Sequence, residues 1–476
     1  MGLGTRFLLR HACHFLMASG QIKASRRRSH QVIVSGMTTG TKTFDIRVHG
    51  CKTNQYDAQQ IRRLLELGGL REVGDGESAD VVVVHTCAVT QSAVRKSRSS
   101  VRQLSRSHEG AEVVVTGCAA EHRLLQSKEE GLRQIPPREG WLTELNDTLF
   151  QAGVLQTPVP LGETADQLML EEFTGHARAF LKVQDGCDIG CTFCIVPRLR
   201  RKPRDKPLDV AVQEARQLVH GGHQEIVVTG ISVGLYGQEG GYRVTLADLL
   251  RELVQIPGLK RLRMSSLHPN ELTPDLLDVW SSSEVIMPHF HLSLQSGSNH
   301  VLREMHRGYT AEEFLDAVER ARACLDRPAF NTDVIVGFPG ETETCFEETM
   351  ELSRQVGFSR MHVFPYSPRP GTQAERRKSR APGSVVKERS QRLRELADRM
   401  ARDYHQMFVG QDSEVLVELW DPGREHYLSY TERYIPVSFV APPGLRGDIV
   451  RVSLTGADEH GATGVYRETL SSTRSE

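Results

Sequence analysis

The sequence lacks any apolar run of the roughly 18 residues that a membrane-spanning helix needs. It also lacks net charge, because 59 Lys and Arg face 60 Asp and Glu, leaving a formal charge of −1. No global positive field draws in nucleic acid, so any contact with RNA must come from local patches. A content of 39% hydrophobic and 25% charged residues is typical of an ordinary globular protein. The length of 476 residues suggests about three domains.

Acidic residues are missing from residues 1–44, although this segment carries seven Lys or Arg side chains. An acid-free start of this kind is typical of an organellar transit peptide. A disordered extension has the same composition, and so does a start codon assigned too early, with Met37 as the true start. Because regular patterning begins only at Phe44, we expect residues 1–42 to be such an extension rather than part of the fold.

Cysteine is sparse, and the number of cysteines is odd. So low a density in so large a chain argues against a secreted disulfide framework. Metal-bound thiolates in a reducing compartment fit better, and we expect a cytoplasmic protein. Three of the nine cysteines fall within eight residues; the full set is Cys13, Cys51, Cys87, Cys118, Cys187, Cys191, Cys194, Cys324 and Cys345.

Residues 43–155 alternate between strand and helix patterns, which predicts a doubly wound α/β domain with a parallel sheet. A cysteine follows each of the three strand patterns. Because the carboxyl ends of parallel strands share one edge, where ligands bind, we expect Cys51, Cys87 and Cys118 to converge. The alternative is that each is a small buried hydrophobe. The expected strands are 44–48, 79–85 and 111–116, and the expected helices are 57–67 and 93–105.

Two further domains follow a polar, proline-bearing linker at 150–175. In residues 170–405, six strand patterns flanked by helical stretches predict a partial or full (β/α) barrel. A charged helix at 385–407 leads into residues 408–472, where short alternating strands predict a small β-barrel. The six strands of the central domain are expected at 180–184, 225–229, 261–265, 289–294, 331–336 and 360–364.

Cys187, Cys191 and Cys194 form a CxxxCxxC loop. Thiolates hold iron–sulfur clusters. A cubane cluster has four irons, so three cysteines leave one iron open to a substrate or cofactor. Gly186 and Gly190 permit the turns that wrapping a cluster requires. Zinc is the alternative, but it normally takes four closed ligands, often as paired CxxC.

With Phe193 before its last cysteine, this loop resembles the cluster motif of radical S-adenosylmethionine enzymes. The resemblance implies a 4Fe–4S cluster whose open iron binds S-adenosylmethionine. It also implies reductive cleavage to a 5′-deoxyadenosyl radical, with Cys187, Cys191 and Cys194 as the catalytic set. A reductant such as flavodoxin or ferredoxin is implied as well.

From residue 44 to near the C-terminus, the chain resembles the methylthiotransferase subfamily of these enzymes. The resemblance implies a second 4Fe–4S cluster, held by Cys51, Cys87 and Cys118, and a sulfur donor that serves it. The C-terminal segment resembles a TRAM domain, a small RNA-binding β-barrel found in several tRNA-modifying enzymes.

The flanks of Cys51, Cys87 and Cys118 look like those of enzymes that act on N6-threonylcarbamoyladenosine in tRNA. The matching segments are GCKTNQY at 50–56, TCAVT at 86–90, RKSR at 95–98 and TGCAA at 116–120. The implied product is the 2-methylthio derivative, beside the anticodon. Two positions depart from the pattern of these enzymes. His85 replaces the Asn that is usual before Thr-Cys, and Leu199-Arg200-Arg201 replaces the small-residue turn that usually follows the cluster loop.

Other readings stay open at this point. The substrate can instead be isopentenyladenosine in tRNA or a ribosomal-protein aspartate. In a different class, the chain can be a non-catalytic iron–sulfur protein that binds RNA, although the three-cysteine loop would then have no purpose.

Further contacts to S-adenosylmethionine are expected along two segments. Residues 333–342 resemble the strand and turn that pack on the adenosine, and an ordinary Gly-Pro turn is the alternative. Residues 293–298 supply polar groups at the end of a strand, where barrel active sites form. His268 and His291 are weaker candidates there. The expected cofactor-binding residues are Gln295, Ser296, Asp333, Gly337 and Glu341.

Two features are candidates for RNA contact. Six cations within nine residues can grip phosphates, unless the run is only a solvated loop. Three tyrosines of the C-terminal barrel can stack on bases, or they can equally be core residues. The cations are Arg198, Arg200, Arg201, Lys202, Arg204 and Lys206, and the tyrosines are Tyr427, Tyr430 and Tyr434.

Overall fold

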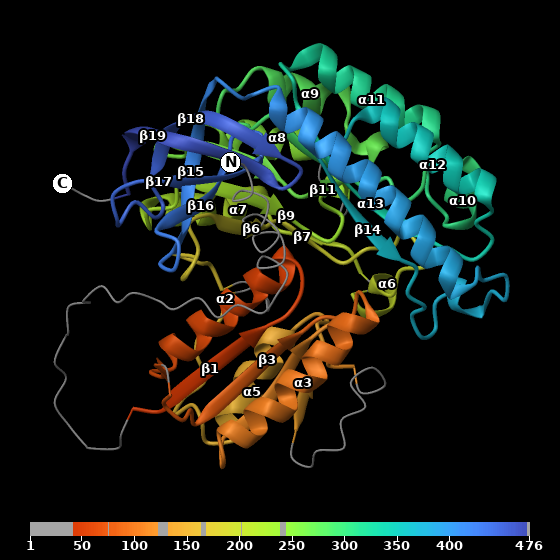
Figure 1. Ribbon diagram of the computed structural model, residues 1–476. Coiled ribbons are helices and arrows are strands. Elements are labelled where there is room, and N and C mark those ends of the chain that lie inside the picture. Colours follow the sequence, from red (N-terminus) through yellow and green to blue (C-terminus); the bar gives the residue numbers. More distant parts are fainter. Residues whose placement is uncertain are drawn as a thin grey trace. The chain divides into compact units, whose positions relative to one another are not determined.

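The computed structural model describes residues 41–74, 76–121, 132–162, 168–200, 202–238 and 244–473. The expected extension at 1–42 therefore lies outside the described residues, except for its last two. The described chain divides into an N-terminal unit, made of residues 41–170 with Arg198–Arg200, and a larger unit from Glu171 onward (Figure 1). Across these ranges no helix combines the length and apolar character needed to cross a membrane.

The N-terminal unit is built on a five-stranded sheet in the order β2-β1-β3-β4-β5, and every strand pair is parallel. The expected doubly wound α/β fold is confirmed, and the three expected strands end within one residue of their predicted ends. The strands are β1 (Thr43–Val48), β2 (Arg71–Glu72), β3 (Val81–Thr86), β4 (Glu112–Gly117) and β5 (Arg133–Ile135). The helices include α2 (Lys52–Leu67), α3 (Gln91–Ser107) and α5 (Trp141–Gln151).

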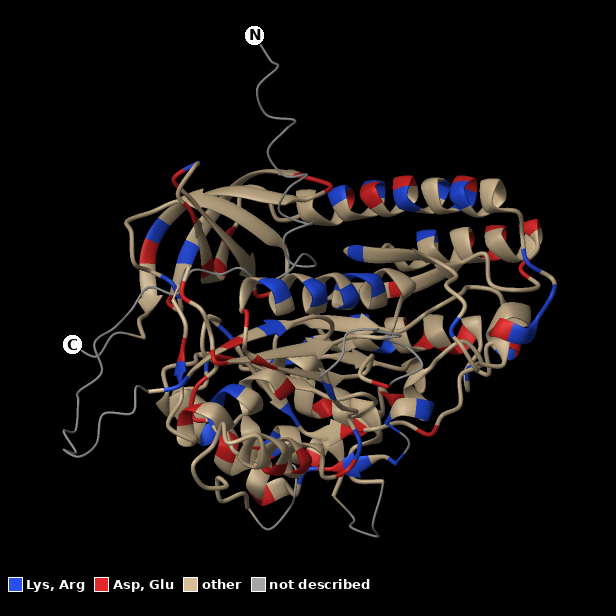
Figure 2. Ribbon diagram, turned by 90° about the horizontal axis from the view of Figure 1, so that it is seen from below, with Lys and Arg blue, Asp and Glu red and all other residues tan. Residues whose placement is uncertain are grey.

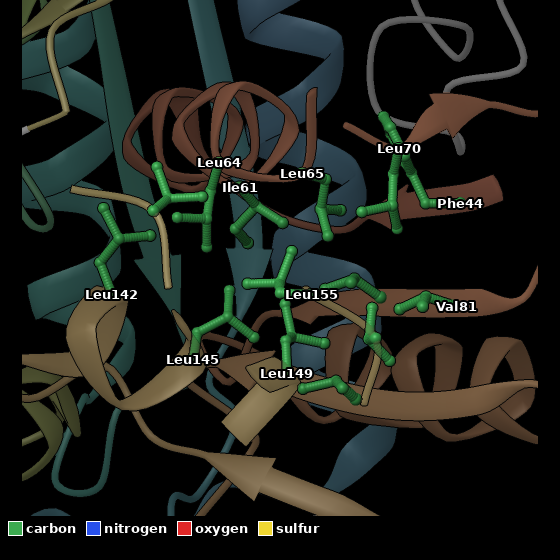
Figure 3. Close-up of a cluster of buried hydrophobic side chains, with 14 of the residues drawn as sticks. Phe44, Ile61, Leu64, Leu65, Leu70, Val81, Leu142, Leu145, Leu149 and Leu155 are labelled. Carbon is green, nitrogen blue, oxygen red and sulfur yellow. The ribbon is translucent and has the colours of Figure 1, made fainter. Parts of the chain in front are cut away.

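One core of this unit lies where α2 and α5 meet the sheet (Figure 3). Leu64 and Leu145 pack there with Val81 of the central strand β3, and all three are fully buried. All six residues of β3 are buried. This burial explains why the strand reads as a continuous apolar run rather than an alternating one, as strands covered on both faces do.

The larger unit contains a partial (β/α) barrel of parallel strands, as the sequence predicted. One sheet has the order β10-β9-β6 and the next β11-β12-β13-β14, and an isolated parallel bridge pairs Leu262 of β10 with Ile286, which lies three residues before β12. The strands are β6 (Ala179–Lys182), β9 (Glu225–Thr229), β10 (Arg261–Met264), β11 (Ser266–Leu267), β12 (His289–Leu292), β13 (Ala329–Val336) and β14 (Arg360–Pro365).

Helices alternate with these strands. They are α7 (Leu208–His220), α8 (Leu246–Leu253), α9 (Pro274–Ser281), α10 (Asn299–Glu304), α11 (Ala311–Cys324) and α12 (Glu343–Val356). Short elements complete the domain: β7 (Gln184–Asp185), α6 (Val196–Leu199), β8 (Arg204–Asp205) and the 3₁₀ turns Val233–Leu235, Pro269–Glu271 and Ala374–Arg376.

The helix α13 (Gly383–Gln406) leads into a closed barrel with the strand order β15-β16-β17-β19-β18. The expected C-terminal β-barrel is therefore confirmed as a fold. Blue segments of Lys and Arg and red segments of Asp and Glu are interspersed along the ribbon in Figure 2, in keeping with the balanced composition. The barrel strands are β15 (Asp412–Asp421), β16 (His426–Thr431), β17 (Pro436–Val440), β18 (Ile449–Asp458) and β19 (Gly461–Ser471).

Candidate functional site: two sets of three cysteines

The structure brings Cys51, Cys87 and Cys118 together at one edge of the N-terminal sheet. Cys51 is the N-cap residue of α2, and Cys87 and Cys118 directly follow β3 and β4. Burial raises the pKa of the Cys87 thiol to about 12, and the nearby Cys118 and Cys51 add to the rise. Bare thiolates are therefore costly at this edge, whereas a bound metal takes cysteine as the thiolate.

Glycines allow the cysteine loops to approach so closely. Gly50 has a φ of 119°, and a Cβ on it would lie 2.9 Å from Cys87 Cβ and 3.1 Å from Cys87 Sγ. Gly117, with a φ of 83°, would place a Cβ 2.5 Å from the Thr86 carbonyl oxygen. The Asn54 amide then ties the first loop to the second, since it donates to the carbonyls of His49 and Thr86, each at 2.8 Å.

Cys187, Cys191 and Cys194 lie on one loop of the larger unit, directly after β7. Gly186 before them has a φ of 82°, and a Cβ there would lie 2.2 Å from the Lys202 carbonyl oxygen. The Cys194 N–H donates to the Cys191 carbonyl at 3.0 Å, which curls the loop. Burial, with smaller contributions from the two neighbouring cysteines, raises the pKa of Cys194 to about 12.

Sequence reasoning missed Arg307, which accompanies this loop. Its Nη1 donates to Cys191 Sγ at 3.3 Å, and its guanidinium lies 5.0 Å from the Tyr309 ring centre. The side chain follows α10, more than 100 residues from the cysteines, so a motif scan offers no signal for it. A hydrogen bond from a cation to a ligand sulfur is one of the means by which a protein tunes an iron–sulfur site.

Among the described residues, no three His, Cys, Asp or Glu side chains converge as they would on one metal ion. Zinc normally takes four such ligands in a closed tetrahedral site. A cubane cluster takes each cysteine on a different iron.

Of the expected cofactor contacts, the structure brings Gln295 and Asp333 side by side. The Gln295 N–H donates to the Asp333 carbonyl at 2.8 Å, and Gln295 is a bridge partner of Val334. Gln295 has a positive φ of 65°, which few side-chain-bearing residues adopt outside tight turns and sites. The Asp333 carboxylate lies 3.2 Å from His291 Nε2. These groups form a polar edge beyond β12.

Ser296 and Glu341 have their side chains engaged inside the protein. The Ser296 hydroxyl is 3.3 Å from Thr349 Oγ1 and accepts from the Ser298 N–H. Glu341 forms a buried ion pair with Arg389 at 2.8 Å and accepts from the Gly337 N–H at 3.1 Å. Both groups therefore stabilise the turns around the polar edge.

His268, the second histidine considered, lies near Arg307. Burial, together with the charge of Arg307, lowers the pKa of His268 to about 3. The imidazole is therefore neutral near pH 7. Burial raises the pKa of the neighbouring Glu271 to about 7. The backbone N–H of His268 donates to the Glu271 carboxyl at 2.8 Å, which holds the two residues next to each other.

The expectation that the whole basic run grips phosphate is wrong. Arg200 is buried in the N-terminal unit with Asp57 at 2.7 Å. Lys206 is buried in an ion pair with Glu214, and Arg204 lies 3.8 Å from Asp185. The acidic partners sit outside the run, so the local sequence hides them. Arg198 and Lys202 are exposed, and Arg201 lies outside the described residues.

The tyrosines also have internal partners. Tyr427 is fully buried in the β-barrel core, where its hydroxyl donates to the Pro442 carbonyl. Tyr430 and Tyr434 stack on each other with ring centres 4.5 Å apart, and Arg178 lies about 5 Å from both rings. Base stacking by Tyr427 and Tyr430 is therefore excluded, and the core alternative holds for them.

A basic surface that sequence reasoning passed over lies on α3. The helix has no acidic residue, and it buries Val94, Ser97, Val101 and Leu104. Its outer face exposes Arg95, Lys96, Arg102 and Arg106. The signal was present in the sequence as an amphipathic, acid-free helix that starts four residues after Cys87. Such a face suits a phosphate backbone.

Two family models match the chain. Residues 181–353 match the Radical SAM superfamily, and residues 43–135 match the family described as Uncharacterized protein family UPF0004. Among solved structures, the radical S-adenosylmethionine methyltransferase TsrM from Kitasatospora setae aligns with a TM-score of 0.52. The alignment covers 71% of this chain and 77% of that one at 15% identity, a likeness in fold alone.

Curated relatives match most of the chain. The "Threonylcarbamoyladenosine tRNA methylthiotransferase MtaB" of Chlamydia pneumoniae is 40% identical over 79% of this chain and 87% of its own length. The protein of the same name in Bacillus subtilis is 34% identical, over 86% and 92%. The "tRNA-2-methylthio-N(6)-dimethylallyladenosine synthase" of Zymomonas mobilis is also 34% identical, over 89% and 97%.

A partial (β/α) barrel with a CxxxCxxC loop after its first strand defines a radical S-adenosylmethionine enzyme. That class implies a 4Fe–4S cluster and S-adenosylmethionine as cofactors. The chain belongs to the radical S-adenosylmethionine tRNA methylthiotransferase family, whose members transfer a sulfur-containing group. Relatives named for two different modified adenosines appear together, so membership alone leaves the substrate open.

Proposed function

We propose that this protein converts N6-threonylcarbamoyladenosine next to the anticodon of tRNA into its 2-methylthio derivative. The observation that carries the sulfur-inserting part is that each unit has its own set of three cysteines. The flanks at 50–56, 86–90 and 116–120 support the substrate. In the fold these flanks enclose the N-terminal cysteines, and Asn54 of the first flank donates to the Thr86 carbonyl of the second. We place the reaction in the cytoplasm, where thiols stay reduced.

Each group of residues has its own part in the proposal. Cys187, Cys191 and Cys194 hold the cluster that binds S-adenosylmethionine, and Gln295 and Asp333 contact that molecule. Cys51, Cys87 and Cys118 hold a second 4Fe–4S cluster. The remaining predicted contacts, Ser296, Gly337 and Glu341, keep the turns around the cofactor in place.

Two molecules of S-adenosylmethionine are consumed per product. When bound, the cofactors supply a radical able to remove hydrogen from an adenine C–H, which acid–base chemistry cannot activate near neutral pH. One molecule would be cleaved to methionine and 5′-deoxyadenosine, the latter carrying that hydrogen, and the other would give up its methyl group and be left as S-adenosylhomocysteine. A reductant such as flavodoxin or ferredoxin supplies electrons, and a sulfur donor replaces the sulfur atom that enters the product.

Substrate choice can be tested directly with the reconstituted enzyme. We expect methylthio transfer to an anticodon stem-loop that carries threonylcarbamoyladenosine. We expect background transfer to the same RNA carrying isopentenyladenosine, and to a ribosomal-protein substrate. Mass spectrometry of the digested nucleosides and of the protein measures all three. Transfer to either of the other two at the higher rate would overturn the substrate part while leaving the family in place.

The α3 surface gives a prediction for tRNA binding. In an Arg95→Gln/Arg102→Gln/Arg106→Gln variant, we expect tRNA affinity near 0.15 M salt to fall on the order of tenfold. The salt dependence of binding should also become shallower, because each lost phosphate contact means that fewer counterions are released when tRNA binds. Fluorescence anisotropy over a salt series measures both. The fold should hold, since all three side chains are exposed.

The matched control for α3 is Arg354→Gln, another exposed helical arginine, which pairs with Glu351 on α12. Its tRNA affinity should equal that of the parent. Equal losses in the control and the α3 variant would show a general charge effect, and the α3 surface would then have no special part in RNA binding.

A further inference from the structure

A buried carboxylate just beyond β13 accepts two hydrogen bonds on one oxygen. Glu341 Oε1 accepts from the Gly337 N–H at 3.1 Å and from Arg389 Nη1 at 2.8 Å. The Arg389 and Glu341 side chains are only 6% and 3% exposed. A buried ion pair is weak evidence for stability, because desolvating two charges costs about as much as their attraction returns. The pair therefore calls for a role in the geometry of the turn that it closes.

Arg389 comes from α13 and bonds to residues on both sides of a helix cap. Its Nη1 also donates to the Glu341 carbonyl at 3.2 Å, and its Nε donates to the Glu343 carboxylate at 2.9 Å. Glu343 is the first residue of α12, and Thr342 between the two glutamates is the N-cap of that helix. Only a guanidinium presents a planar fork of donors that can bond to several acceptors at once. Arg389 thus joins the turn to the start of α12.

The turn at residues 337–341 has a shape that admits α13. Gly337 has a φ of 77°, and a Cβ on it would lie 2.5 Å from Cγ2 of Val386 on α13. The Gly340 N–H donates to the Ser379 carbonyl at 2.8 Å, in the segment that precedes the helix. In Figure 1 α13 lies beside α12, which the turn leads into. A distant part of the chain therefore holds the turn from one side.

The same turn adjoins the cysteine loop at 187–194. Phe338 of the turn is fully buried in an apolar cluster that includes Ala374, and Phe193 of the cysteine loop packs against this cluster. The Ala374 N–H donates to the Thr192 carbonyl at 2.9 Å. The turn also begins at the carboxyl end of a barrel strand, where (β/α) barrels place their active sites. It is therefore suited to contact a molecule that the cysteine loop holds.

The polar edge is connected to the turn through β13. The Ile335 N–H, two residues before the turn, donates to the Gln295 carbonyl at 2.9 Å. The Gln295 N–H donates back to the Asp333 carbonyl at 2.8 Å. A ligand at this edge therefore meets a strand whose end is held by the turn.

We propose that Arg389 is a positioning residue for S-adenosylmethionine: by holding the Glu341 carboxylate on the Gly337 N–H, it keeps the turn in the shape that receives this molecule. The inference rests on the proposed cofactor contacts at the polar edge. Without Arg389, the buried Glu341 carboxylate loses its ion-pair partner, which favours rotation toward water and away from the Gly337 N–H. The affinity for S-adenosylmethionine should then fall, whereas the bond-breaking step should be little changed.

The test uses the full chain with the cluster of the 187–194 loop reconstituted. Arg389→Gln and Arg389→Lys are compared with the parent, and Arg399→Gln is the matched control because Arg399 is an exposed arginine of the same helix. Equilibrium dialysis gives the Kd of S-adenosylmethionine, and 5′-deoxyadenosine formation under dithionite gives KM and kcat. Hydrogen exchange of the peptide 336–342 is measured without cofactors. No tRNA enters these assays, so they are independent of the proposed substrate.

We expect Arg389→Gln to raise the Kd and the KM for S-adenosylmethionine on the order of tenfold, the equivalent of about one hydrogen bond. Its kcat should stay within about twofold of the parent value, because only binding is weakened. The peptide 336–342 should exchange faster. Arg389→Lys, which keeps the charge without the fork, should fall between Arg389→Gln and the parent. Arg399→Gln should match the parent.

Parent affinity in Arg389→Gln overturns the inference even when the melting temperature falls, because the pair then serves only the scaffold. Unchanged exchange of the peptide, or an equal loss of affinity in Arg399→Gln, overturns it as well. Should Arg389→Gln not fold, Arg389→Lys decides by the same criteria. A parent that holds its cluster but binds no S-adenosylmethionine instead contradicts the proposed cofactor contacts, and this inference with them.

Discussion

Replacing the two cysteine sets separately is expected to split the reaction into two halves. With Cys187, Cys191 and Cys194 changed to Ala, no 5′-deoxyadenosine and no methylthio product should form. With Cys51, Cys87 and Cys118 changed to Ala, 5′-deoxyadenosine should still form under dithionite, but product should fall to background. The reason is that the sets occupy separate units, and each is closed by its own glycines, Gly186 for one and Gly50 for the other.

Iron measurements give the same prediction a readout independent of activity. The parent should hold two cubane clusters, and either triple variant should hold one, by iron content and Mössbauer or EPR spectra. Cys324→Ala is the control, since this exposed cysteine on α11 lies outside both sets. Absence of 5′-deoxyadenosine from the parent would leave only a non-catalytic iron–sulfur protein that binds RNA. Two clusters in the N-terminal variant would remove those cysteines from the ligand set.

Features that follow from local pattern and chain direction were predictable from the sequence. The run VVVV before His85 indicates a strand buried on both faces, and parallel strands end at a common edge. The positions of Cys51, Cys87 and Cys118 follow from these two facts. The CxxxCxxC loop can be recognised without any knowledge of the fold, because its three cysteines lie within eight residues.

Features that depend on a distant partner were not predictable. Arg200 looks like part of a basic loop until Asp57, 143 residues away, is placed beside it. Tyr430 and Tyr434 look like exposed aromatics of a β-barrel until Arg178 is found against their rings. A cation or an aromatic ring has the same local signal whether it faces RNA or an internal partner. The fold decides between the two.

Glu225 of β9 is the clearest example of such an internal partner. Its carboxylate is fully buried and lies 3.0 Å from Arg263, 3.3 Å from Arg178 and 3.7 Å from Arg261. Burial by itself would raise the pKa of Glu225, but these cations lower it to about 2. Arg263 also donates to the carbonyl oxygens of Thr431 and Glu432, each at 2.8 Å. The carboxylate thereby helps to join the parallel barrel to the C-terminal one.

Glu225→Gln should therefore destabilise the larger unit strongly, by about 3–5 kcal/mol, because Arg263 loses its carboxylate partner and the buried cluster loses a charge that Arg178 and Arg261 also share, although these two still face Glu418 and Glu414. We expect a large drop in the melting temperature of the apoprotein, measured by calorimetry near pH 7. Glu351→Gln, at the exposed pair with Arg354, is the control and should cost roughly 0–1 kcal/mol.

The depressed pKa of Glu225 predicts how the stability difference between the parent and Glu225→Gln changes in acid. The stabilisation by the Glu225 carboxylate is complete above the unfolded-state pKa of 4.5 and is lost as pH falls toward the folded-state pKa of about 2. The melting temperatures of parent and Glu225→Gln should therefore approach each other as pH falls through that window. Curves that stay parallel from pH 7 to the acid limit, or a variant as stable as the parent at pH 7, would show that the three arginines are balanced by other groups. In that case Glu225 would not be the charge that joins the two barrels.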